Sequence, residues 1–183
     1  MPMPSPLPSP ASVFLFAWGR PLLVLHALSA LVLGGASVHQ AVVALRLLRR
    51  KPSARLLRWA RLFSRIALYA YIAVMALGAL IYPRYRYFVR GLFLDREAPW
   101  ASNLFDFKEN LATLGLPFAV AAVLLATQLG RVPATVQADD TLTERAPLER
   151  KLIRLYALFA VATATVAIFN LLAGLLVTSV HGI

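Results

Sequence analysis

The chain has 183 residues, of which 60% are hydrophobic and 15% are charged, and its mean hydropathy is +0.69. This composition excludes an ordinary soluble domain, in which about 25% of residues are charged. The absence of cysteine excludes disulfides, thiolate metal sites and iron–sulfur clusters, and the formal net charge of +11 requires its own explanation.

The N-terminal segment is rich in proline and begins MPMPSPLPSPAS. It lacks the basic and apolar regions of a cleaved signal peptide. Its composition predicts a disordered tail over residues 1–19, followed by a single transmembrane domain over residues 20–183.

Four apolar stretches follow the tail, at about residues 22–45, 63–82, 111–129 and 155–180. Each is long enough, or nearly so, to cross a hydrocarbon layer of about 30 Å. Backbone groups in lipid must form their hydrogen bonds internally, which favours helices, and no strand-like alternation is present. The sequence therefore predicts an all-α integral membrane protein, a four-helix bundle.

The first apolar stretch contains LHALSALVLGGASVHQ, with two histidines among small residues. His26 shares a helical face with Ala30 and Gly34, where small side chains allow close helix packing. His39 lies about 20 Å further along the helix and about 140° around it. We therefore expect His26 to be a ligand and His39 to be structural, donating a hydrogen bond to a neighbouring helix.

Later segments give weaker local signals. The stretch ARLLRWARLFSRIALYAYIAVM predicts one long helix with a basic, aromatic start at the headgroups. The connection RGLFLDREAPWASNLFDFKEN predicts an interfacial segment. Pro117 predicts a kink, Pro147 predicts the first turn of the last helix, and Asn170 and Gln128 predict interhelical hydrogen bonds.

The positions of the basic residues predict the orientation. Thirteen of the 19 lysines and arginines lie in the connections between the first and second and between the third and fourth stretches. Those connections should be cytoplasmic, so that both termini lie outside, in the periplasm. This topology and anionic lipid headgroups account for the positive charge, so we expect no nucleic-acid partner.

In this topology, ionisable and aromatic residues from all four helices lie near the outer face. They are His26, Tyr82, Arg84, Lys108, Glu109 and His181, together with Asn110. Ionisable groups at membrane depth are costly and mark candidate functional sites. The alternative is that all of them except His26 simply occupy the interface.

Three chemistries fit such a group of residues. Haem b requires an axial imidazole, which His26 supplies, with His181 as the second axial ligand and Arg or Lys near the propionates. A quinone would use a His or Tyr donor beside small residues. Copper or zinc would need His26 with Glu109 or His181, a thin ligand set, so haem or quinone is preferred.

The segment LHALSALVLGG, with His26 and then Gly34 and Gly35, resembles the opening helix of the CopD-like and HemJ-like membrane proteins. The HemJ-like pattern also has a lysine on its third helix, which corresponds to Lys108 in FDFKENL. These families are helical, and the resemblance to the HemJ-like one implies haem binding and protoporphyrinogen oxidation. This chain departs from the family pattern at one position, since Val32 or Leu33 stands where the families have tryptophan. The resemblance therefore assigns a functional role only to His26 and Lys108.

These observations predict a multi-pass protein of the bacterial inner membrane that binds a cofactor near the outer leaflet, for electron transfer or for porphyrin or quinone oxidation. Whether it is an enzyme stays open. The alternatives are an accessory subunit that docks onto a larger membrane complex, or onto a second copy, through Gly34 and Ala30, and a small transporter or copper-handling protein.

Overall fold

A computed structural model describes residues 15–50, 52–130 and 142–180 of the chain. Its regular elements are all helical: η2 (Phe16–Trp18), α1 (Gly19–Arg49), α2 (Ala54–Arg84), η3 (Tyr85–Leu94), α3 (Asp95–Glu97), α4 (Pro99–Leu129) and α5 (Leu142–Val180). Each predicted apolar stretch lies within one long helix. The prediction of an all-α chain with four helices long and apolar enough to cross a membrane is confirmed.

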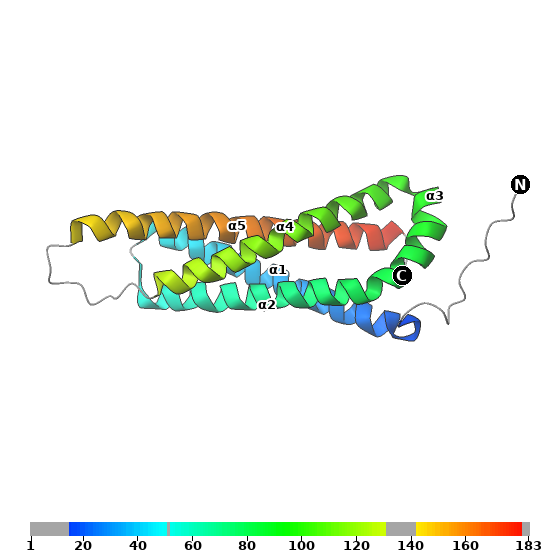
Figure 1. The fold of residues 1–183 in the computed structure, drawn as a ribbon, viewed down its shortest axis with the longest axis horizontal. Coiled ribbons are helices and arrows are strands. Elements are labelled where there is room, and N and C mark those ends of the chain that lie inside the picture. Colours follow the sequence, from blue (N-terminus) through cyan, green and yellow to red (C-terminus); the bar gives the residue numbers. More distant parts are fainter. Residues whose placement is uncertain (1–14, 51, 131–141, 181–183) are drawn as a thin grey trace, which may run out of the picture.

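The four long helices form an elongated bundle (Figure 1). Helix α1 packs beside α2 and α5, and α4 packs beside the same two helices from the other side. The start of α1, the turn between α2 and α4 and the end of α5 lie at one end of the bundle (Figure 1). The connection from α1 to α2 and the start of α5 lie at the other end.

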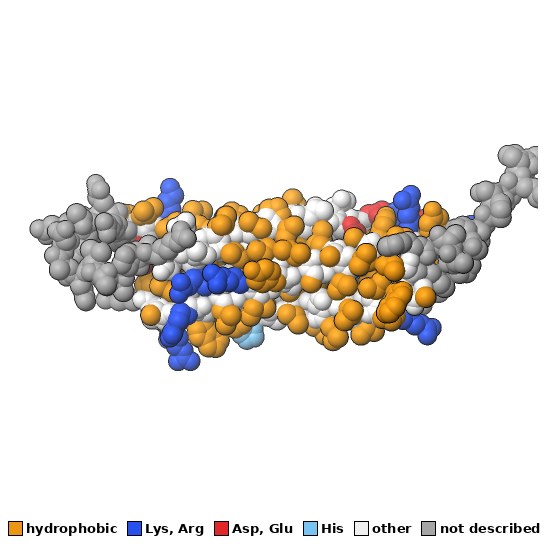
Figure 2. All heavy atoms as spheres, turned by 60° about the horizontal axis from the view of Figure 1, so that its bottom comes forward, with side chains coloured by type: hydrophobic (Ala, Val, Ile, Leu, Met, Phe, Trp, Pro, Cys, Tyr) orange, Lys and Arg blue, Asp and Glu red, His pale blue; other side chains and the backbone are white. Residues whose placement is uncertain are grey.

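The bundle turns most of its apolar surface outwards. In the most apolar 18-residue window of each helix, between 17% and 39% of residues are buried inside the molecule. Large side chains such as Leu28, Leu124 and Leu158 are more than half exposed. Figure 2 shows hydrophobic side chains along the middle of the bundle, with lysine and arginine towards its ends. This surface suits a lipid environment.

The interior is built from small residues, which allow the helix backbones to approach closely. Six alanines from different parts of the bundle are completely buried: Ala44, Ala60, Ala67, Ala101, Ala122 and Ala160. Gly34 is buried too, and an added Cβ there would lie 3.5 Å from Leu171 and 3.7 Å from Ile168 on α5. Gly34 therefore packs against α5 inside the chain, whereas one of the sequence-based alternatives gave it a docking role towards another subunit.

The connection between α2 and α4, for which the sequence predicted an interfacial segment, is helical. Helix α2 continues into η3, a π-helix, two residues after Pro83, whose missing N–H removes an α-helical hydrogen bond. The chain reverses only at Ala98, where φ is −144° and ψ is 62°, and α4 begins at Pro99, a favoured first position. Trp100 and Tyr87 are exposed there, as expected of interfacial aromatic residues.

Other boundaries also differ from the predicted ones. Residues 1–14 of the predicted tail lie outside the described residues, while η2 and the first residue of α1 occupy its last part. Helix α5 begins at Leu142, so Pro147 lies inside it and not in its first turn. Helices can extend past the hydrocarbon layer because water satisfies their terminal backbone groups there.

The hydrogen bonds of two polar side chains also differ from the prediction. His39 Nδ1 lies 2.8 Å from the carbonyl oxygen of Gly35, and Asn170 Nδ2 donates to the carbonyl of Val166 at 2.9 Å. Both bonds stay within one helix, so the predicted interhelical hydrogen bonds are wrong. The His39 ring contacts α2 by stacking on Phe63, with ring centroids 5.0 Å apart.

Helix α4 runs through Pro117, and α2 supports it just before this point. Tyr71 Oη donates a hydrogen bond of 2.9 Å to the carbonyl oxygen of Ala112. The phenol passes directly over Gly115, where an added Cβ would collide with the hydroxyl and lie 2.6 Å from Cζ. The carbonyl that Pro117 leaves without its helical N–H partner is that of Thr113, so the Tyr71 bond braces α4 one residue earlier and does not replace the lost bond.

Gly115→Ala should lower the free energy of unfolding by about 1–3 kcal/mol, because the rigid Tyr71 ring must move. Gly174→Ala is the matched control, since an added Cβ there meets nothing within 4 Å. Thermal melting of the purified variants in detergent measures both effects. Equal melting temperatures for the two variants would contradict this packing.

Candidate functional site

His26 is fixed between α1 and α2. Its Nδ1 lies 3.1 Å from the carbonyl oxygen of Val74 on α2. Because a carbonyl can only accept, Nδ1 carries the proton and Nε2 keeps its lone pair. The ring lies over Gly78, where an added Cβ would be 3.4 Å from Cε1. A ring N–H bonded to a carbonyl is the usual arrangement of a metal-ligating histidine.

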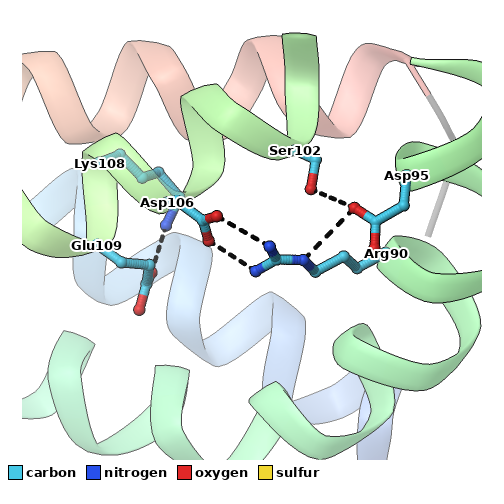
Figure 3. Close-up of polar contacts among 6 residues, drawn as sticks. All are labelled: Arg90, Asp95, Ser102, Asp106, Lys108 and Glu109. Carbon is cyan, nitrogen blue, oxygen red and sulfur yellow. Dashed lines mark hydrogen bonds and ion pairs between the residues drawn. The ribbon is translucent and has the colours of Figure 1, made fainter. Parts of the chain in front are cut away.

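Lys108 and Glu109 lie near His26. Lys108 Nζ is 2.7 Å from Glu109 Oε1 (Figure 3). It also lies 4.3 Å from the centroid of the Phe105 ring. The Lys108 side chain is only 15% exposed, whereas that of Glu109 is 51% exposed. Both charges act electrostatically on the His26 ring. Lys108 and Glu109 on α4 thus lie within electrostatic range of His26 on α1.

The other predicted site residues have different surroundings. The Arg84 side chain covers Gly19, the first residue of α1, where an added Cβ would collide with the guanidinium. The ring of Tyr82 is stacked with that of Phe105, with centroids 6.4 Å apart. His181, the predicted second axial ligand, lies outside the described residues.

The sequence analysis missed an ion-pair cluster at the same end of the bundle. Arg90 donates to both carboxylate oxygens of Asp106, at 2.6 and 2.8 Å. Arg90 Nε also lies 3.5 Å from Asp95 Oδ1, and this oxygen accepts a hydrogen bond from Ser102 Oγ (Figure 3). The cluster joins η3 and α3 to α4. Bidentate pairs of this kind fix geometry as well as adding energy.

A polar pocket of about 480 Å³ opens beside this cluster, and the residues that line it are Tyr82, Arg86, Tyr87, Arg90, Gly91 and Asp95. Most of them belong to the π-helix, a rare form that is frequent at functional sites. Tyr85, also in η3, buries its hydroxyl without a partner among the described residues and stacks on Phe105, with centroids 4.1 Å apart. This end of the bundle can therefore accept a polar or anionic group.

The described residues contain no group of three or more His, Cys, Asp or Glu side chains that could hold a metal ion. The predicted copper or zinc site was His26 with Glu109 or His181, and His181 lies outside the described residues. The described residues do offer one oriented imidazole, His26, within electrostatic range of the mostly covered ammonium group of Lys108.

Comparisons of this chain with family models, with curated proteins and with solved structures give no match. The resemblance to the CopD-like and HemJ-like proteins thus stays a prediction, and the site must be interpreted from its own geometry.

Asp106→Asn should lower the free energy of unfolding by about 1 kcal/mol, because it weakens the bidentate pair with Arg90, which is partly exposed. The loss should shrink at high salt, which screens the wild-type pair. Glu97→Gln is the control, since Glu97 is exposed in α3 and this substitution removes the same charge. Detergent melting at two salt concentrations gives the comparison, and identical curves for both variants would contradict a role for the cluster.

Proposed function

We propose that the protein is a multi-pass component of the bacterial inner membrane that binds a cofactor at His26, near the outer leaflet. The first candidate is haem b, and the function is electron transfer or the oxidation of a porphyrin or quinone. The observation that carries this proposal is the hydrogen bond from His26 Nδ1 to the Val74 carbonyl. This bond leaves the lone pair of Nε2 in a fixed orientation for a metal ion.

The proposed orientation rests on charge. Thirteen of the 19 basic residues lie in or next to the two stretches of sequence that connect α1 to α2 and α4 to α5. By the positive-inside rule the bundle end that holds the connection from α1 to α2 faces the cytoplasm, and the end that holds His26, Lys108 and Glu109 faces the periplasm. Both termini then lie outside.

The residues present fit one side of a haem. His26 Nε2 would bind the haem iron, and the missing side chain of Gly78 makes room for the His26 ring itself against α2. Lys108, held by Glu109 near His26, would place a cation close to a propionate. His181 is the proposed second axial ligand. Bound haem would supply one-electron chemistry, while the chain orients it and sets its electrostatic surroundings.

A quinone is the second cofactor that this end could hold. Its carbonyl oxygens need hydrogen-bond donors, and the phenols of Tyr82 and Tyr87 beside the polar pocket are donors of this kind. In that case His26 would contribute as a hydrogen-bonding group and not as a metal ligand.

An accessory subunit is the alternative function, and one observation favours it. Gly35 is exposed on α1, and an added Cβ there would meet nothing within 4 Å. A helix of another subunit, or of a second copy, could approach the backbone closely at this point. No feature of the described residues favours the transporter or copper-handling class.

The absorption spectrum of protein purified in detergent after haem-replete expression tests the proposal. Wild type should show a Soret band, and His26→Ala should abolish it, because losing an axial imidazole removes the main bond that holds the iron. His39→Ala is the matched control and should keep the band, since its ring bonds within α1 and stacks on Phe63.

The opposite pattern, with the band lost from His39→Ala and kept in His26→Ala, would move the site to the other end of the bundle and contradict the proposal. Wild-type protein without a chromophore would favour the accessory subunit.

A further inference from the structure

Two polar side chains of α1 are completely buried without partners. Ser37 and Gln40 are both 0% exposed. Among the described residues, Ser37 Oγ and both Oε1 and Nε2 of Gln40 have no hydrogen-bond partner. Gln40 lies nine residues before the end of α1, about 14 Å along the helix axis, so this place is deep in the bundle.

Several other polar side chains in the bundle form hydrogen bonds to carbonyls of their own helices. The hydroxyls of Thr127 and Thr163 donate to the carbonyls four residues earlier, both at 2.8 Å, and Asn170 does the same with its amide. Ser37 and Gln40 do not use this arrangement. Leaving three buried polar atoms unpaired in an apolar interior would cost several kcal/mol, so they require a partner.

Polar residues of the neighbouring helices lie at a similar level. His39, next to Gln40, stacks on Phe63, next to Ser64, so Gln40 and Ser64 lie at similar heights on α1 and α2. Ser64 is completely buried, and its Oγ lies 3.3 Å from Tyr156 Oη on α5. The interior of this half of the bundle therefore contains a polar layer shared by three helices.

We propose that Ser37 and Gln40 form an internal binding site for ordered water, in which one molecule bridges Ser37 Oγ and the Gln40 amide. A buried water is stable where two to four polar atoms surround it, and these two side chains supply three. The two residues are three positions apart and lie on adjacent turns of one helix, so one molecule can reach both. The site is separate from His26 and does not depend on the proposed cofactor.

A double-mutant cycle tests the proposal by thermal melting in detergent. If the site holds water, Gln40→Leu and Ser37→Ala should each lower the melting temperature by a few degrees. The double variant should be close to Gln40→Leu, because both changes remove the same bridging molecule. If the site is dry, Gln40→Leu removes an unsatisfied amide and should raise the melting temperature.

Ser37→Ala combined with Asn170→Leu is the matched control, and its effects should add, since the Asn170 amide is already satisfied on its own helix. Two results would overturn the proposal: a higher melting temperature for Gln40→Leu, or additive decreases in melting temperature in the Ser37 and Gln40 cycle. If Gln40→Leu does not fold, a high-resolution structure of the wild-type protein decides. An ordered peak within hydrogen-bonding distance of both side chains supports the water site, and continuous apolar packing there excludes it.

Discussion

Close approach of helix backbones is the constraint on which the rest of the structure depends. In lipid there is little hydrophobic driving force between helices, so packing at short range has to hold the bundle together. Alanine fills the interior, Gly34 lets α1 meet α5, and Gly115 lets the Tyr71 phenol cross α4. Larger residues at these positions would separate the helices and change every contact described at the His26 end.

The proposed site follows from this packing and from the turn between α2 and α4. Glycine at position 78 allows the His26 ring to lie against α2 and bond the Val74 carbonyl. The π-helix after Pro83 and the reversal at Ala98 bring the chain back, so that Arg90 meets Asp106. Lys108 lies one turn or less beyond Asp106 on α4, and this ion pair therefore also fixes the helix that carries Lys108.

The sequence was sufficient to predict the number of long helices and their apolar middle sections, because length and hydropathy determine which segments can cross a bilayer. It also indicated the small-residue packing around Gly34. It was not sufficient for the connection after Arg84, since proline and arginine there were compatible with a loop, and the helix type depends on how the turn packs against α4.

The parts of the site that the sequence analysis missed are contacts between residues that are far apart along the chain. Arg90 and Asp106 are 16 positions apart, a spacing that matches no helical period, and only the reversal at Ala98 brings the two side chains together. Gln40 shows the same limit, because the hydrophobic pattern gives no sign that its amide is unpaired. For His39 and Asn170 the reasoning failed because a bond within the same helix competes with one between helices.

The central claim is that the His26 end faces the periplasm, and labelling of single cysteines tests it most directly. The chain has no cysteine, so each substitution introduces the only thiol. Asn103 is exposed on α4 at the His26 end, and Pro52 is exposed in the connection from α1 to α2. A membrane-impermeant maleimide should label Asn103→Cys in intact spheroplasts and should label Pro52→Cys only after lysis. Labelling of Pro52→Cys in intact spheroplasts, with no labelling of Asn103→Cys, would contradict the account.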